Sequence, residues 1–285
     1  MTPAKKFFKK NQTAFLLTGI IILFLAIFIP VKLKEGHRDT NTPVVLTSEI
    51  KILQSIEPDA RAEVVVPILM YHHIRNYNDP KDTIGTNLSV PIENFDAQIK
   101  YLKENGYSTI TFADFVAFPG KKLPEKPVIV TFDDGYDDAY TNAYRVLKNN
   151  GDVAVFYIIS SFMGRDDIVT VSQIKEMSDN GMEIGSHTVD HPDLTTISAT
   201  KLKSELTKSK TAIEAIIGKS VISFCYPSGK NNSLVDTATK DVGYTTATTT
   251  VSGVSTTSSD KFALPRIRIT ATDNLTTFAN KLAGK

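Results

Sequence analysis

The chain has 285 residues, of which 41% are hydrophobic, so it is long enough for one large globular domain and too apolar to be disordered throughout. Its 32 basic and 31 acidic residues give a net charge of +1, which excludes the strongly basic character of a general nucleic-acid-binding protein. The single cysteine, Cys225, excludes an intrachain disulfide and any metal site with several thiolate ligands.

The first 31 residues are typical of a membrane anchor. Residues 1–13 contain four lysines, and residues 14–31 form an uncharged apolar stretch. At about 1.5 Å per residue, a helix over this stretch is about 27 Å long, close to the hydrocarbon thickness of a bilayer. A cleaved signal peptide is the alternative, but no small-x-small cleavage site follows. We therefore expect a basic cytoplasmic tail over 1–13 and a single-pass transmembrane helix over 14–31. The body would then lie outside the cytoplasm, at the cell membrane.

A polar segment separates this anchor from the globular body. Residues 32–63 are mixed in charge and contain two prolines, which is typical of a linker, although a short helix near 48–56 also fits. The catalytic domain is expected over residues 64–285. It opens with an apolar run over 64–71 of the kind that forms a buried strand.

Helical and strand patterns alternate through this domain. Helices are predicted over 94–105, 111–118, 138–150, 172–180 and 198–217. Buried strands are predicted over 127–132, 153–159, 182–185 and 221–225, and the Thr- and Ser-rich stretch 245–259 fits a strand with a loop. Repeated strand–helix units of this size indicate a parallel sheet, closed or nearly closed into an α/β barrel.

Two adjacent carboxylates follow the predicted strand 127–132. Asp133 and Asp134 precede Gly135, which lets the chain turn sharply. Chemistry in an α/β barrel is placed at the C-terminal ends of the strands. Because two like charges repel, a cation or a shared proton is expected there. A simple Asp-Asp-Gly turn that caps a helix is the alternative.

Two histidines follow the predicted strand 182–185. His187 and His191 are four residues apart and can converge on one metal ion, although a surface loop with incidental histidines is also possible. With Asp134 they would form a site that leaves positions open for water and substrate. Asp133 would remain free as a base, which indicates hydrolysis. Such ligands suit one divalent ion, zinc first, with cobalt, nickel and iron as alternatives.

The segments 131–135 (TFDDG) and 187–191 (HTVDH) resemble the first two motifs of the polysaccharide deacetylase family, which is also known as carbohydrate esterase family 4 or the NodB-like domain. The resemblance implies a distorted (β/α) barrel of NodB type. It implies that Asp133 is the general base. It also implies that Asp134, His187 and His191 hold the metal, and that the partner is an acetylated polysaccharide.

A third family motif is present in altered form. Residues 224–229 (FCYPSG) stand where the family has Arg-Pro-Pro-Tyr-Gly, with Cys225 in place of the arginine that orients the base. The turn is retained, so the backbone N–H of Ser228 is expected to serve as an oxyanion donor. Arg266 is expected to supply the missing charge, with Arg268 as the other candidate; ordinary charges on a surface strand are the alternative. The substrate-contacting turn comprises Tyr226, Pro227, Ser228 and Gly229.

The general acid needs a different source from the family's late histidine, because no histidine follows His191. His72 and His73 follow the first strand, and this opening resembles the branch that acts on poly-β-1,6-N-acetylglucosamine. That resemblance implies that His72 is the acid, while His73 faces away because adjacent strand residues point to opposite sides. A purely structural histidine is the alternative.

Two classes of function therefore remain. The favoured one is a metal-dependent hydrolase that removes N-acetyl groups from an extracellular or cell-wall polysaccharide, poly-N-acetylglucosamine first, with peptidoglycan or a chitin-like glycan as alternatives. The other is an inactive, membrane-tethered glycan-binding module. In either class four aromatic residues are candidates for stacking on sugars, although they also fit a core: Tyr71, Phe132, Tyr136 and Tyr226. No nucleic-acid partner is expected, and the sequence does not indicate an oligomeric state.

Overall fold

The structure, a computed structural model, describes residues 63–284. The expected tail, the transmembrane segment 14–31, the short helix near 48–56 and nearly all of the linker lie outside the described residues. In the described part, no helix is both long and apolar enough to cross a membrane.

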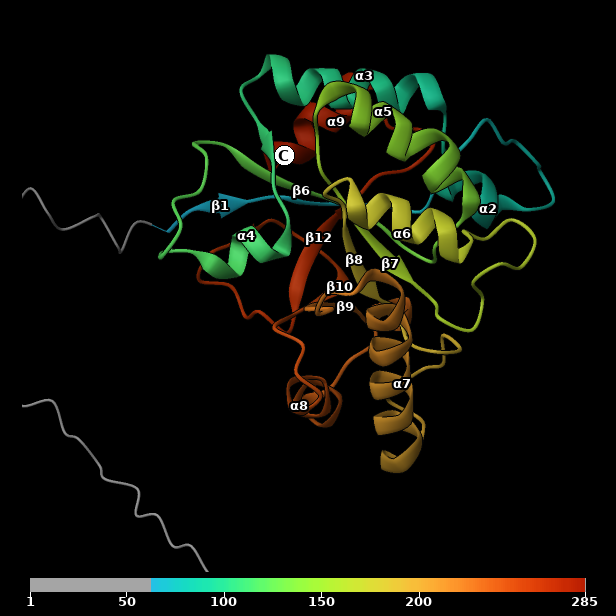
Figure 1. Ribbon diagram of the computed structural model, residues 1–285. Coiled ribbons are helices and arrows are strands. Elements are labelled where there is room, and N and C mark those ends of the chain that lie inside the picture. Colours follow the sequence, from blue (N-terminus) through green and yellow to red (C-terminus); the bar gives the residue numbers. More distant parts are fainter. Residues whose placement is uncertain (1–62, 285) are drawn as a thin grey trace, which may run out of the picture. The chain divides into compact units, whose positions relative to one another are not determined.

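Seven parallel strands close into a barrel (Figure 1). Around the ring they are β2 (Ile68–Tyr71), β12 (Leu264–Arg268), β10 (Thr246–Ser252), β9 (Ser223–Cys225), β8 (Glu183–Ser186), β7 (Val155–Ile158) and β6 (Pro127–Phe132). The barrel closes because β6 also pairs with β2, in parallel like every other pair in the ring. The expected parallel α/β barrel is confirmed, and its seven strands distort it from the usual eight.

Five short strands lie outside this ring. The described chain adds β5 (Ser108–Thr109) beside β6, pairs β1 (Val65–Val66) with β11 (Ser255–Thr256), and pairs β3 (His73–Ile74) with β4 (Ser89–Val90).

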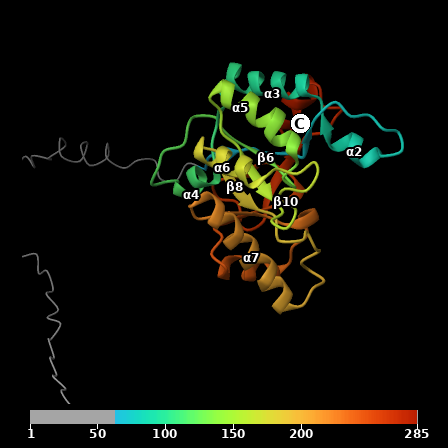
Figure 2. The same cartoon turned by 45° about the vertical axis from the view of Figure 1, so that its right-hand side comes forward.

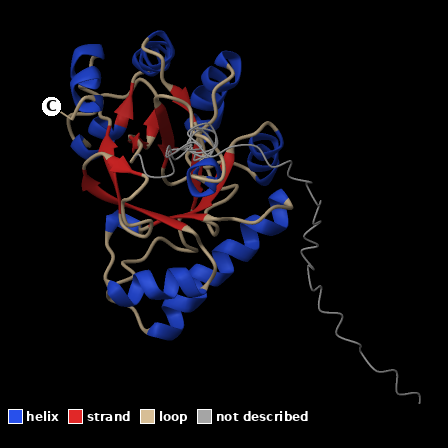
Figure 3. Ribbon diagram, turned by 90° about the vertical axis from the view of Figure 1, so that its left-hand side faces the viewer, coloured by secondary structure: helices blue, strands red, loops and turns tan. Residues whose placement is uncertain are grey.

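Helices surround the barrel, as Figure 3 shows in blue around the red strands. They are α2 (Thr83–Leu88), α3 (Ile92–Glu104), α4 (Phe112–Ala117), α5 (Arg145–Asn150), α6 (Val171–Asp179), α7 (Ala199–Ile217), α8 (Ser233–Asp241) and α9 (Leu275–Leu282). A π-helical turn, Ala139–Tyr144, leads into α5. Helices α3 and α9 lie side by side (Figures 1 and 2). The sequence patterns located α3 to α7 within a few residues but did not predict α2, α8 or α9.

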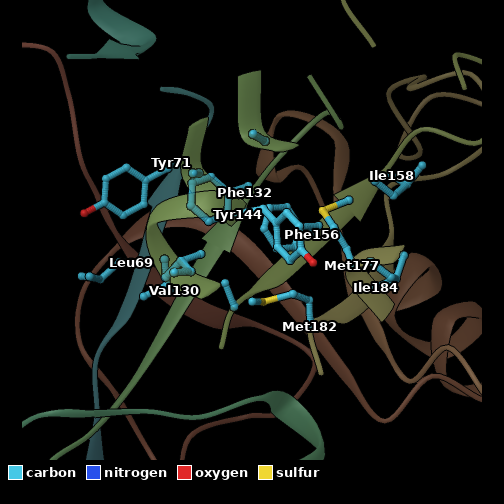
Figure 4. Close-up of a cluster of buried hydrophobic side chains, with 14 of the residues drawn as sticks. Leu69, Tyr71, Val130, Phe132, Tyr144, Phe156, Ile158, Met177, Met182 and Ile184 are labelled. Atoms are coloured by element: carbon cyan, nitrogen blue, oxygen red, sulfur yellow. The ribbon is translucent and has the colours of Figure 1, made fainter. Parts of the chain in front are cut away.

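The alternation of side chains along the strands divides the core into two clusters. One cluster fills the barrel interior with residues such as Ile68, Ile129 and Leu264, and α4 adds Phe112 and Phe115 at the N-terminal end of the strands. The other lies between the strands and the outer helices, where the rings of Tyr71, Phe132 and Phe156 stack in a row (Figure 4).

This burial corrects one expectation from the sequence. Tyr71, Phe132 and Tyr226 are completely buried, so they are core residues and not platforms for sugar rings. Only Tyr136, which is partly exposed, remains available for that role.

Candidate active site

The candidate residues meet at one rim of the barrel because each follows the C-terminal end of a parallel strand. His72 follows β2, Asp133 and Asp134 follow β6, and His187 and His191 follow β8. Backbone conformation is unusual here. Of the five non-glycine residues with positive φ in the described chain, Asp134, Thr188 and His191 lie in these segments, and Ser228 lies in the turn after β9. Such strain is concentrated at functional sites.

Asp134, His187 and His191 form a compact donor set. The Nε2 atoms of His187 and His191 lie 3.4 Å and 3.8 Å from Oδ1 of Asp134. All three ligand atoms lie within 4.8 Å of one another, as a single ion requires. The Nδ1 of His187 donates to the Cys225 carbonyl at 2.7 Å, which leaves its Nε2 lone pair directed at the site. The residues therefore fit a divalent metal with nitrogen and oxygen ligands.

A buried glutamate on α7 fixes the loop that carries these histidines. Glu205, which is 1% exposed, accepts hydrogen bonds from the backbone N–H groups of Val189 and Asp190 at 2.8 Å and 3.0 Å. The backbone N–H of His191 donates to the Thr188 hydroxyl at 2.9 Å. The loop is thus held in place by its own turn and by a helix behind it.

Asp133 forms a bidentate ion pair with Arg266. The guanidinium Nη1 and Nη2 atoms each lie 2.7 Å from one carboxylate oxygen. Arg266 has no exposed surface, so the reading of this strand as an ordinary charged surface is wrong for this residue. Its Nη1 also donates to the Thr131 hydroxyl, and its Nε donates to the Thr249 carbonyl. Arg268, the other candidate, makes no ion pair with residues 63–284.

The ion pair sets the charge of the carboxylate. Burial alone would raise the pKa of Asp133, but the adjacent Arg266 reverses this and holds that pKa well below its usual range. Cys225 lies against both partners, with its Sγ 3.2 Å from the Arg266 Nη2 and 3.6 Å from Asp133. The thiol brings no positive charge to Asp133, and the guanidinium that reaches the carboxylate comes from β12.

His72 and His73 face different surroundings. The Nε2 of His72 lies 3.9 Å from Oδ2 of Asp133, and its buried Nδ1 has no hydrogen-bond partner in the described chain. Burial lowers the pKa of His72, and the two nearby carboxylates oppose that shift. His73 instead lies 2.7 Å from Asp138 and stacks on Tyr136, with ring centroids 3.6 Å apart.

Only part of the turn after β9 is exposed and accessible to a ligand. Tyr226 and Pro227 are buried, and the Tyr226 hydroxyl donates to the Phe262 carbonyl. Ser228 is exposed with φ 55°, and Gly229 follows with φ 70°. A Cβ on Gly229 would lie 2.4 Å from the Thr250 nitrogen, so the close approach to β10 requires glycine here.

Several supporting residues were not predicted from the sequence. Tyr136, which the sequence suggested only as a platform for sugar rings, lies near Asp134. Burial raises the pKa of its hydroxyl, and that carboxylate raises it further. Thr131 could have been found, because it lies two residues before Asp133 on the same face of β6. No pattern in the sequence indicated Thr249 or Glu205, because their hydrogen-bond partners are remote in sequence.

Comparison with known proteins adds a family and a set of relatives. The sequence profile described as polysaccharide deacetylase matches residues 120–247. The Bacillus subtilis (strain 168) protein YxkH, described as belonging to the same class, is 36% identical over 206 residues, which are 72% of this chain and 71% of YxkH. The Staphylococcus aureus (strain MSSA476) poly-beta-1,6-N-acetyl-D-glucosamine N-deacetylase is 28% identical over 273 residues, which are 88% of this chain and 91% of that protein.

A solved structure shares the fold. The Streptococcus pyogenes deacetylase PplD, in complex with acetate, is 30% identical and superimposes with a TM-score of 0.72, over 78% of this chain and 99% of its own. The residues matched by the profile include Asp133, Asp134, His187 and His191, whereas His72 and Arg266 lie outside the match.

Proposed function

Because this chain belongs to the polysaccharide deacetylase family, we propose that it removes acetyl groups from N-acetylglucosamine units of an extracellular or cell-wall polysaccharide with the aid of one divalent metal ion. Family membership makes it a hydrolase that acts on amide bonds. The finer proposal depends mainly on one observation. The Asp134, His187 and His191 donors surround one point beside a carboxylate that Arg266 keeps ionised.

The proposed chemistry is the hydrolysis of an acetamide to acetate and an amine. A bound divalent ion would polarise the acetyl carbonyl and acidify water. Asp133 accepts a proton from the attacking water, and its two bonds to Arg266 fix the direction in which it accepts. The backbone N–H of Ser228 donates to the oxyanion.

His72 completes the reaction by protonating the leaving nitrogen from Nε2. An amide anion is too poor a leaving group to depart without that proton. The lowered pKa of His72 makes its imidazolium a stronger acid, at the cost of a smaller protonated fraction at neutral pH.

Zinc is the proposed ion, because two imidazoles and one carboxylate suit it, with cobalt, nickel and iron as alternatives. Poly-N-acetylglucosamine is the proposed polymer, since the Staphylococcus aureus enzyme named for it aligns with 88% of this chain. Peptidoglycan and chitin-like glycans are the alternatives. An inactive glycan-binding module is less well supported, because the proposed base and metal ligands are all present and close together.

We also propose that residues 14–31 anchor the protein in the cell membrane with its catalytic domain outside the cytoplasm. The lysine-flanked, uncharged stretch supports this proposal. Protein purified from the membrane fraction should therefore keep residues 14–31 when its N-terminus is sequenced. A mature N-terminus near residue 35 would identify a cleaved signal peptide instead.

The decisive experiment measures free acetate from a panel of polymers. The full-length protein in detergent is loaded with zinc and offered poly-N-acetylglucosamine, chitin oligomers and peptidoglycan. We expect release from the first, with the release stopped by a chelator and restored by added ion. Release from another polymer alone would replace the substrate, and release unaffected by chelation would refute the metal mechanism. Glycan binding without acetate from any polymer would favour the inactive module.

A further inference from the structure

The loop over residues 187–191, which carries both proposed histidine ligands, has an unusual backbone. Two of its residues, Thr188 and His191, have φ of 70° and 57°. Residues with a side chain avoid this left-handed region, so the surrounding structure must hold the loop in its shape. A loop without that support would relax and carry the His191 imidazole away from Asp134.

Glu205 supplies this support from outside the loop. Between the two left-handed residues, the backbone N–H groups of Val189 and Asp190 both donate to Oε2 of Glu205, at 2.8 Å and 3.0 Å. Oε1 of the same carboxylate pairs with Lys201 at 2.7 Å, which balances its charge and fixes its rotation. Glu205 is 1% exposed, so water does not compete for these bonds. The middle of the loop therefore depends on one buried side chain.

Helix α7, which carries Glu205, is itself fixed to the strand that precedes the loop. Ser209, one turn after Glu205, accepts a hydrogen bond from the Ser186 hydroxyl at 2.8 Å, and both serines are buried. Ser186 is the last residue of β8, directly before His187. The helix runs for 19 residues (Figure 1), so it is a rigid support rather than a second loop.

We propose that Glu205 is a positioning residue that holds the loop 187–191 in its metal-binding shape before any ion is bound. This inference rests on the proposed function, because it concerns affinity for the divalent ion named there. Glu205 acts through Val189 and Asp190 on His191, which follows them in the chain. A loop that is already in place loses less conformational freedom when the ion binds, so the ion binds more tightly.

The affinity for zinc, measured by competition with a coloured chelator on the full-length protein in detergent, tests the proposal. Glu205→Met keeps the length of the side chain and removes its acceptors, so zinc affinity should fall about 10- to 100-fold, the usual loss when a group that supports a metal ligand is removed. Glu205→Gln should retain most of the affinity, because its carbonyl oxygen can still accept from both N–H groups.

Glu214 provides a matched control on the same helix. Like Glu205, it pairs with a lysine one turn earlier, Lys210, at 3.0 Å, and it accepts a backbone N–H, that of Val221, at 3.0 Å. Val221 precedes β9, at the opposite end of the barrel from the proposed metal ligands. Glu214→Met should therefore lower the midpoint of urea unfolding and leave zinc affinity at the wild-type value. Equal losses of zinc affinity in Glu205→Met and Glu214→Met would indicate a general loosening of α7 and would overturn the inference.

Hydrogen exchange on the metal-free wild-type protein gives a test that needs no substitution. The N–H groups of Val189 and Asp190 should exchange about 10- to 100-fold more slowly than exposed loop N–H groups without an acceptor, as bonds to a carboxylate predict. Added zinc should change their rates little, because the bonds already exist. Fast exchange that becomes slow only with zinc would show that the ion orders the loop and would overturn the inference, even if Glu205→Met failed to fold.

These outcomes also separate the inference from the proposed function. Unchanged zinc affinity in Glu205→Met would overturn the inference alone and leave the proposed metal site intact. A wild-type protein that binds no zinc, cobalt, nickel or iron would overturn the proposed metal site, and this inference with it.

Discussion

Replacement of His72 by alanine should lower the turnover of acetate release by about 10²–10⁴-fold, the usual contribution of a positioned proton donor. His72 is the described histidine closest to Asp133 outside the proposed metal ligands, and its Nε2 lies 3.9 Å from that carboxylate. Its buried Nδ1 makes no bond in the described chain, so the substitution should not break a structural contact there. Metal content, measured by elemental analysis, should therefore stay at the wild-type level.

His73→Ala is the matched control for this substitution. His73 bonds Asp138 at 2.7 Å and stacks on Tyr136, so its loss should reduce stability more than turnover. Steady-state kinetics and urea unfolding on both variants separate the two effects. Similar, small losses of turnover in both variants would show that the proton comes from another group.

Replacement of Arg266 by methionine should destabilise the fold by about 3–5 kcal/mol, the usual cost of leaving one partner of a buried ion pair alone. Asp133 is 3% exposed and Arg266 is completely buried, so water cannot replace the lost contacts. Acetate release should also fall sharply, because the proposed base loses both its orientation and the charge that keeps it ionised. Urea unfolding in the presence of a chelator measures the stability without a contribution from bound metal.

A double variant shows whether the effect belongs to the pair. Asp133→Asn combined with Arg266→Met removes both charges, so its cost should be clearly smaller than the sum of the two single costs. Additive costs, or a loss below about 1 kcal/mol for Arg266→Met, would mean that the ion pair does not hold the site together.

Local patterns in the sequence located most of the barrel. The continuous apolar run at 127–132 indicates a strand buried on both faces, and the helical spacing at 198–217 indicates which face of that helix is buried; this information is contained within a few residues. Local sequence patterns also predicted that Asp133, Asp134, His187 and His191 lie at strand ends, where a parallel barrel brings them together. The outer helices α2, α8 and α9, of six, nine and eight residues, were not predicted, and helices this short are stabilised mainly by packing on other elements.

The tertiary structure decided which side chains are buried and which residues far apart in the sequence come into contact. Both Arg266 and Arg268 face the same side of β12, so alternation could not select between them. Only the register of β12 against its neighbours places Arg266 level with Asp133, which is 133 residues earlier in the chain. The same register leaves Arg268 at the rim of the barrel. The sequence by itself therefore determined the family, the barrel and the residues at the strand ends. Closure of the sheet decided which cation is buried with the base and which forms no ion pair within residues 63–284, because contacts across a barrel depend on strand register and not on distance along the chain.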